Sequence, residues 1–140
     1  MTPAADLVGL TVTHRRYVPY SHAHYAGDLV DGAYVLGLFG DVATEMCIRT
    51  DGDEGLFASY SDVQFLEPVR AGDVVEVDAR LSRVGTRSRE LQLEARVVCR
   101  GRGSAGPAAP RATAASSAEV LDPPVVAVTA TGTVVVPAPS

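Results

Sequence analysis

The chain has 140 residues and a mass of 14.6 kDa, enough for one domain with its own hydrophobic core and no disulfide staples. It is 46% hydrophobic, but no apolar run approaches the roughly 20 residues that span a bilayer, so no membrane segment is expected. Seventeen acidic and twelve basic residues give a net charge of −5 without a basic stripe, which argues against a nucleic-acid partner. The N-terminus lacks the pattern of a secretory signal, so we expect a cytoplasmic location.

The first part of the chain predicts one strand, a polar loop and one long helix. Residues 9–19 contain loosely alternating β-branched side chains and end at a proline, which is typical of a strand. The helix is predicted over residues 30–49, with Asp28 or Asp31 as a cap at its start and the glycine-containing turn 50–55 at its end. At about 100° per residue, its apolar side chains fall in one sector. These side chains are Val35, Leu38, Phe39, Val42, Ala43 and Met46.

The remainder of the chain predicts four strands. Apolar and polar side chains alternate in the middle two, which indicates antiparallel strands with one covered face. The strands are expected over residues 56–66, 73–84, 88–100 and 125–136. Residues 101–118 are mostly Gly, Ala, Pro and Ser, so we predict a mobile loop there, inside a single domain of residues 1–140. Cys47 and Cys99 lack a metal-type spacing, and both are predicted to be buried thiols.

One long helix beside about five antiparallel strands has few compact arrangements. The simplest wraps the sheet around the helix so that the apolar sector is covered. We therefore predict an α+β protein with the hot-dog fold, an antiparallel sheet of about five strands around one long helix. An exposed sheet edge invites pairing with a second copy, so a homodimer or a higher homo-oligomer is expected.

Several segments resemble known enzymes of this fold. FLEPVRAGDVV at 65–75, followed by VGTRS at 84–88, resembles the strand-turn-strand signature of hot-dog acyl-thioester enzymes. A narrower and strong resemblance, to the 3-aminobutyryl-CoA ammonia-lyases of lysine fermentation, extends over nearly the whole chain. Its segments are HYAGDLVDGA at 24–33, LFGDVATE at 38–45, DGDEGLF at 51–57 and ATGTVVVP at 130–137. The chain departs from that family at Asp28, where asparagine is usual, and in the Ala- and Pro-rich loop.

The resemblance implies reversible elimination of an amine from a β-aminoacyl thioester. The reverse reaction is a Michael-type addition of ammonia or an amino-acid amine to a 2-enoyl thioester. No cofactor is implied, because CoA or the pantetheine of an acyl carrier protein is part of the substrate. Two alternatives stay open. One is an acyl-CoA or acyl-carrier thioesterase, with or without amino-acid addition, and the other is a non-catalytic acyl-thioester-binding module.

The elimination requires donors that polarise the thioester carbonyl and groups that exchange protons at C2 and at nitrogen. The free N–H groups at the helix start, around Asp31, Gly32 and Ala33, can supply the donors, and Gly32 permits close approach of a ligand. The alternative is that Gly27 and Gly32 only permit a tight turn. Further substrate-binding candidates are Tyr25, Gly27 and Asp28 at the helix entrance, and Arg87 and Ser88 at a turn. Arg87 could contact phosphates, as could Arg70, Arg83 and Arg89; the alternative is that each of these arginines is a solvated charge at the sheet edge.

The acid–base candidates are His24, Asp31, Asp41 and Glu45. His24 has the strongest claim, because its position before Gly27 matches a polar residue in the loop of hot-dog thioesterases, and we expect His24→Ala to abolish turnover. Asp31 and Glu45 are separated by roughly 21 Å along the helix, so they cannot share one proton within a subunit. Asp41 and Glu45 lie one turn apart, where they either form a coupled pair or simply meet solvent.

The remaining histidines have weaker claims. His22, with Tyr25, is a secondary acid–base candidate, and His14 is expected to be structural or on the surface beside two arginines. A cluster of His22, His24, Asp28 and Asp31 fits no metal-ligand spacing, and carboxylates near a helix start are explained more simply as caps. We therefore predict no metal.

Overall fold

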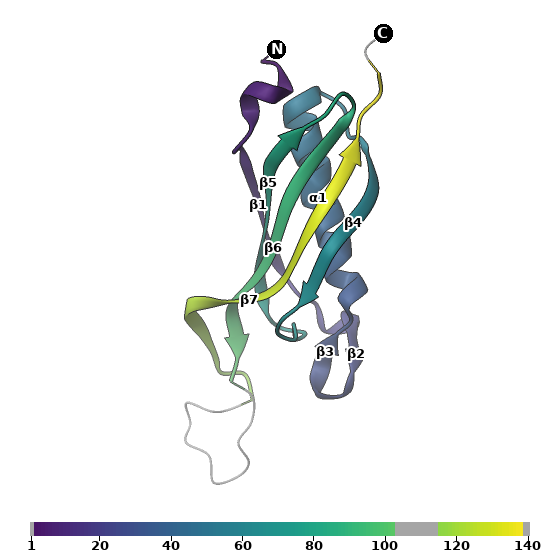
Figure 1. The fold of residues 1–140 in the computed structure, drawn as a ribbon. Coiled ribbons are helices and arrows are strands. Elements are labelled where there is room, and N and C mark those ends of the chain that lie inside the picture. The colour runs from purple at the N-terminus through teal and green to yellow at the C-terminus, as the bar shows by residue number, and fades with distance from the viewer. Residues whose placement is uncertain (1, 103–114, 139–140) are drawn as a thin grey trace.

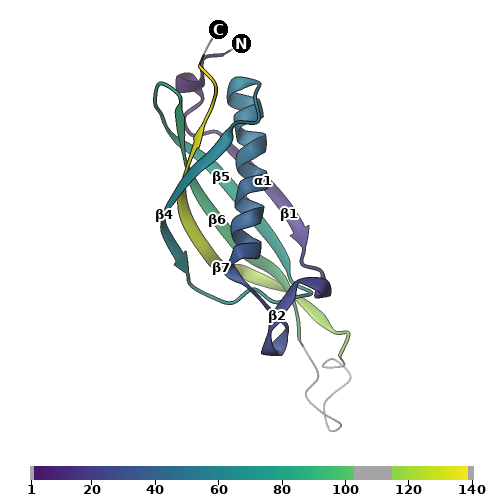
Figure 2. The same ribbon diagram turned by 90° about the vertical axis from the view of Figure 1, so that its right-hand side faces the viewer.

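The structure, a computed structural model, describes residues 2–102 and 115–138. Five strands form one antiparallel sheet in the order β1-β5-β6-β7-β4, and a two-stranded ribbon, β2-β3, precedes the helix. The five-stranded sheet curls around the helix α1 (Figure 1, Figure 2). The elements are β1 (Thr11–Tyr17), β2 (Ala23–Tyr25), β3 (Leu29–Val30), α1 (Gly32–Asp51), β4 (Leu56–Phe65), β5 (Val74–Val84), β6 (Ser88–Gly101) and β7 (Ala118–Val135). The predicted hot-dog architecture is confirmed.

Asp31 and Gly52 account for where helix α1 begins and ends. The side chain of Asp31 caps the start by accepting from the Tyr34 N–H at 3.0 Å, and Asp28 does not serve as the cap. Gly52 ends the helix with φ of 65°, a left-handed conformation that glycine adopts without steric cost. The helix is therefore shifted by two residues at each end relative to the prediction. All six apolar side chains of the predicted sector are buried.

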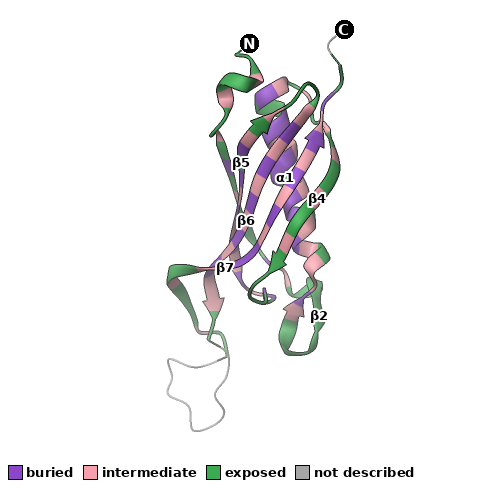
Figure 3. Cartoon of the chain, viewed as in Figure 1, coloured by how far each residue is buried: buried purple, intermediate pink, exposed green. Residues whose placement is uncertain are grey.

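The core lies between α1 and the inner face of the sheet. Alternate side chains of β5 and β6 point inward and are almost fully buried, and the alternation is visible along both strands in Figure 3. The inward residues are Val75, Val77, Ala79, Leu81, Leu91, Leu93, Ala95 and Val97. Because each strand places every second residue on this face, the predicted alternation is confirmed.

The β6-β7 pair differs from the prediction. β7 begins at Ala118, and its first residues pair with the end of β6, Ala118 with Gly101 and Val120 with Cys99. The loop predicted over residues 101–118 is therefore shorter at both ends, and residues 103–114 lie outside the described part of the chain. Cys47 is buried as predicted, but Cys99 is partly exposed because it lies in this projecting hairpin.

Within the described residues, no helix is long and apolar enough to cross a membrane.

Candidate active site

The segment before α1 is shaped by backbone pairing with the turn that follows β4. The Val30 N–H donates to the Val69 carbonyl at 2.9 Å, and the Ala71 N–H donates to the Asp28 carbonyl at 2.8 Å. Gly27 and Asp28 have φ of 76° and 61°, so the chain turns sharply there before it forms β3. The sequence did not reveal the β2-β3 ribbon, because three-residue and two-residue strands are too short for a periodic pattern.

The start of α1 offers free backbone donors. The Tyr34 N–H is used by the Asp31 cap, whereas the N–H groups of Gly32 and Ala33 donate no hydrogen bond within the described residues. The aromatic ring of Phe65, at the end of β4, lies against Gly32. A methyl group added at Gly32 would come within 2.6 Å of the Phe65 Cε1 atom. Glycine is therefore needed here for close packing as well as for ligand approach.

An open, largely apolar cavity of about 450 Å³ is lined by Gly32 at the start of α1, whereas Ala33 does not line it. Its walls come from β3, the start of α1, the end of β4 with the turn after it, and β7. We call it the entrance cavity. Its lining residues are Tyr25, Leu29, Val30, Asp31, Gly32, Val35, Phe65, Leu66, Glu67, Pro68, Val69 and Val128. The cavity joins two acidic residues, a helix N-terminus and apolar walls, so polar and apolar groups converge on one space.

The structure brings some of the predicted entrance residues to this cavity and leaves others outside it. Tyr25, Asp31 and Gly32 line the cavity. His24 is exposed, and the edge of its ring contacts Tyr25 with the ring centroids 4.6 Å apart, but it does not line the cavity. Ala33 is exposed at the first turn of α1.

Gly27 and Asp28 instead line a second, smaller cavity of about 220 Å³ on the other side of the β3 pairing. Arg100 lies in its wall and binds the buried Asp73 carboxylate through two nitrogens at 2.9 and 3.0 Å. Arg70 also lines it, and its side chain has no hydrogen bond or ion pair within the described residues. Three arginines, Arg70, Arg100 and Arg102, thus line this smaller cavity together with Asp28 and Asp73.

Glu45 is engaged in ion pairs at the middle of α1. One oxygen lies 2.9 Å from the His14 Nε2 atom, and the other accepts from the Arg49 Nε at 2.8 Å. The hydrogen bonds from Arg49 and then from His14 lower the pKa of Glu45. Asp41 is exposed, and none of the cavities described here is lined by Glu45 or Asp41.

His14 contacts Glu45 from β1, a contact that the sequence did not predict. It lies on β1 facing α1, and its Nδ1 atom is buried without a hydrogen-bond partner among the described residues. The alternation of β1 could have indicated this contact, because Val12 and His14 share the face that packs on the helix. The prediction of a structural role is consistent with its contact to Glu45.

Arg87 and Ser88 lie at the opposite end of the molecule from the helix entrance (Figure 1). Ser88 pairs with Val135, and the Arg87 Nε donates to the Val136 carbonyl at 3.1 Å. A helix of 20 residues is about 30 Å long, so these two residues cannot contact a ligand at Gly32 within one protomer. Their predicted contact with phosphates stays a prediction.

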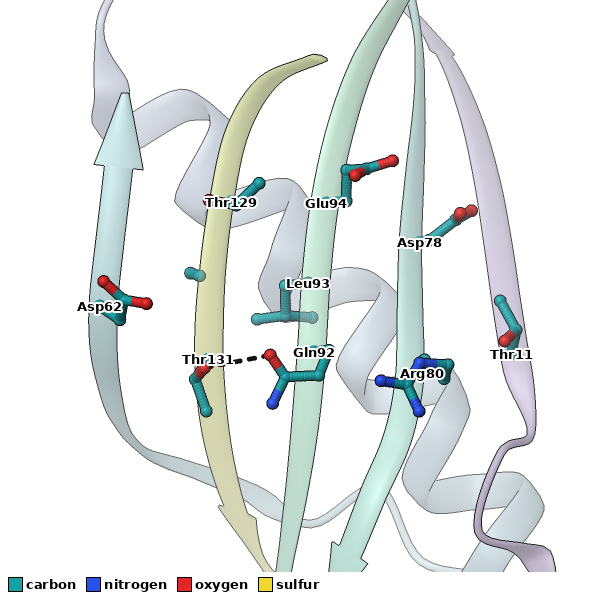
Figure 4. A pocket seen from close by; sticks show the side chains of 10 residues that line it. Thr11, Asp62, Asp78, Arg80, Gln92, Leu93, Glu94, Thr129 and Thr131 are labelled. Atoms are coloured by element: carbon teal, nitrogen blue, oxygen red, sulfur yellow. Dashed lines mark hydrogen bonds between the residues drawn. The ribbon is translucent and has the colours of Figure 1, made fainter. Parts of the chain in front are cut away.

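A third, polar cavity of about 330 Å³ lies on the outer face of the sheet, away from α1 (Figure 4). Side chains from all five strands line it, and Thr131 donates to Gln92 across it at 3.2 Å. None of the residues predicted to be catalytic lines this cavity. Among the described residues, no group of three or more His, Cys, Asp or Glu is arranged to hold a metal ion.

Substitution of Gly32 by alanine tests the importance of the entrance cavity. The added methyl group would displace the Phe65 ring, which is 57% exposed and able to move, so the fold should survive while the cavity narrows. We expect thioester turnover to fall at least about tenfold with little change in melting temperature. The double variant Gly32→Ala, Phe65→Ala removes the clash and should recover part of the activity. Equal activity of Gly32→Ala and wild type would argue against this cavity as the reaction site.

These features define a hot-dog protein with a largely apolar cavity at the start of its helix. Residues 29–103 match the thioesterase superfamily, and the chain belongs to this superfamily. It is 49% identical over 116 residues to a 3-aminobutyryl-CoA ammonia lyase from Acetoanaerobium sticklandii, a match that covers 82% of this chain and 85% of the relative.

Two solved structures are similar to the structure of this chain. The β-alanyl-CoA:ammonia lyase from Clostridium propionicum is 35% identical, with a TM-score of 0.80, covering 92% of this chain and 86% of that one. A hexameric thioesterase from Yersinia pestis shares the fold at 19% identity, with a TM-score of 0.66, covering 92% and 88% of the two chains. The resemblance to the ammonia lyases seen in the sequence is thereby confirmed.

Proposed function

We propose that this protein is a carbon–nitrogen lyase that reversibly eliminates an amine from a β-aminoacyl-CoA thioester. The observation that carries this proposal is that Asp31 and Gly32, whose N–H group donates no hydrogen bond within the described residues, line one largely apolar cavity. The ammonia-lyase names of the two relatives with at least 35% identity support the same reaction. CoA enters as part of the substrate, so the reaction calls for no resident cofactor.

Each step of the elimination has a group suited to it. The N–H donors at the start of α1 polarise the thioester carbonyl and stabilise the enolate that forms when C2 loses its proton. The carboxylate of Asp31 accepts that proton, the C3–N bond breaks, and the nitrogen leaves as neutral NH3. The proton held by Asp31 then passes to NH3, a transfer that His24 can assist from beside Tyr25. Addition to the enoyl thioester follows the same steps in reverse.

A thioesterase is the second candidate, because the superfamily match and the wider set of fold neighbours include acyl-CoA hydrolases. In that reaction Asp31 would activate a water molecule, which would attack the thioester carbonyl and release free CoA thiol. A binding module without catalysis would retain the cavity but would tolerate loss of the Asp31 carboxylate. The fold alone does not distinguish these three activities, since function depends on the site.

The deciding experiment is incubation of the protein with crotonyl-CoA and ammonia, followed by mass spectrometry. The lyase gives an adduct with the mass of aminobutyryl-CoA and little free thiol. Free thiol without adduct would establish a thioesterase instead, and no turnover of any acyl thioester would leave the binding module. A parallel reaction with His24→Ala tests the predicted role of His24, because unchanged rates would exclude it from the proton transfers.

We further propose a homodimer formed through the edge strand β4. This edge exposes Leu56 (75%) and Phe65 (57%), whereas the opposite edge, β1, carries two arginines that discourage strand pairing. Two-fold antiparallel pairing would place the Leu56 end of the partner beside the Phe65 end of this protomer. Since Ser88 lies at the Leu56 end, the partner's β5-β6 turn would approach the entrance cavity. Arg87 and Ser88 would then contact the phosphates of CoA bound to the other protomer.

The double variant Ala58→Glu, Ser61→Glu tests this pairing, because both positions are exposed on β4 and like charges would face each other across the two-fold axis. We expect the wild type to be at least a dimer and the variant to be a monomer with strongly reduced turnover, as measured by light scattering and the adduct assay. Tyr17→Glu on the β1 edge is the matched control and should remain a dimer. A monomeric wild type with full activity would refute the proposal.

A further inference from the structure

Two acidic residues line the entrance cavity. Its ionisable lining residues are Tyr25, Asp31 and Glu67, and the other residues that line it are apolar or glycine. No arginine or histidine of the described chain lines this cavity, although all twelve basic residues of the protein are arginines with long reach. Within one protomer, a ligand that fills this cavity therefore meets apolar walls and two acidic residues, Asp31 and Glu67.

Neither carboxylate is neutralised by a neighbour. Asp31 accepts a hydrogen bond from the uncharged Tyr34 N–H, and it forms no ion pair with any residue in the described part of the chain. Glu67 is anchored through its backbone, since its N–H donates to the Ala127 carbonyl at 3.2 Å, while its carboxylate has no partner within the described residues. Arg70, the cation closest in the sequence, lines the smaller cavity on the other side of the turn.

The free carboxylates are also positioned for different tasks. Asp31 is fixed by its cap bond at the helix start, beside the donors that would hold the thioester carbonyl. Glu67 comes from the turn after β4, on a different wall of the same cavity, and is exposed. A negative cavity with apolar walls attracts a ligand that has an apolar body and a cationic end, and it repels a second anion.

We infer that Glu67 is a specificity-determining residue, which binds the ammonium group of the β-aminoacyl substrate and excludes amines that also carry a carboxylate. This inference rests on the proposed lyase reaction. In the addition direction it selects ammonia or a simple alkylamine over an amino acid, because the carboxylate of glycine would enter a cavity already lined by Asp31 and Glu67. Asp31 remains the proton acceptor, and Glu67 determines which amine binds.

A binding experiment tests the charge preference without any turnover. The probes are three unreactive CoA thioethers of similar size that carry a 3-aminopropyl, a propyl or a 2-carboxyethyl group. Isothermal titration of the full-length protein should give the tightest binding for the aminopropyl compound, about tenfold tighter than for the propyl compound, and the weakest for the carboxyethyl compound. Glu67→Gln should narrow these differences, and Glu67→Arg should reverse the order of the two charged probes. Glu54→Gln, an exposed glutamate at the other end of α1, is the control and should bind as the wild type does.

A turnover experiment tests the consequence for the reaction. With crotonyl-CoA, the wild type should form adducts with ammonia and methylamine at least about 30-fold faster than with glycine. Glu67→Arg should lower this ratio at least about tenfold by losing rate with ammonia and gaining rate with glycine. Equal rates for ammonia and glycine in the wild type, or a ratio that Glu67→Arg leaves unchanged, would overturn the inference while leaving the lyase in place. Absence of every adduct would refute the proposed reaction, and the thioether series would then decide the charge preference alone.

Discussion

Replacing Asp31 with asparagine is expected to lower the rate of ammonia addition to crotonyl-CoA at least about 100-fold without changing the melting temperature. The amide oxygen of asparagine can still accept from the Tyr34 N–H, which Asp31 caps at 3.0 Å, so the helix start keeps its structure. The amide cannot accept a proton from C2. Loss of activity with an intact fold would therefore report the chemical role of the carboxylate.

Two further variants separate this role from the cap. Asp31→Ser also keeps a capping oxygen and should be as inactive as Asp31→Asn, while Asp31→Ala should in addition lose about 1 kcal/mol of stability. Differential scanning calorimetry measures the stability, and the adduct assay measures the rate. If Asp31→Asn retained more than a tenth of the wild-type rate, Asp31 would not be the proton acceptor.

The largest effect on stability is expected for Asp51→Asn at the other end of α1. Asp51 accepts two hydrogen bonds from the Arg89 guanidinium, at 2.7 and 2.9 Å, and the side chain of Arg89 is only 7% exposed. Removal of one partner leaves a buried charge unpaired, which costs about 3 kcal/mol. In a domain of this size that loss lowers the melting temperature by about 10 °C. Arg15→Gln, which removes an exposed ion pair with Glu76, is the control and should change stability by less than about 1 kcal/mol.

The same ion pair should make stability depend on pH. The hydrogen bonds from Arg89 lower the pKa of Asp51 in the folded protein. Its contribution is thus fully present above the unfolded pKa of about 3.9 and is lost as the pH falls through the lower folded value. Urea unfolding between pH 5 and pH 2.5 should show wild type and Asp51→Asn converging as the pH drops. Curves that stay parallel would mean that the pair does not stabilise the protein.

Much of the fold was predictable because its signals are local. The periodicity of Val35 to Met46 and the alternation in β5 and β6 arise from the same faces that the structure buries. The ribbon β2-β3 was not predicted, because its strands are too short to show alternation. The predicted start of β7 lies too far along the chain, because Pro123 and Pro124 are inside the strand and proline is unusual there.

The site was predicted only in part, because it combines residues that are distant in the sequence. Asp31, Gly32 and Tyr25 were identified from the chemistry of a helix start, and they do line one cavity. Phe65 and Glu67 were not predicted to be site residues, although they lie in the segment 65–75 that resembles hot-dog enzymes. No local pattern indicates that the end of β4 and the turn after it pack against Gly32. Glu45 was predicted to be catalytic from its helical spacing, but its contact with His14 depends on how β1 packs against α1. The predicted roles of His24, Asp41 and Glu45 stay predictions.

The contact between Phe65 and Gly32 has a consequence for the speed of binding. The ring that lies against the helix start belongs to a single exposed side chain, and its backbone is held in the sheet by pairing with Val128. Rotation of an exposed side chain takes picoseconds to nanoseconds, so the Phe65 wall of the entrance cavity can adjust to a ligand without loop opening on the microsecond to millisecond scale. Association with a thioester should accordingly proceed in a single kinetic phase whose rate rises linearly with ligand concentration.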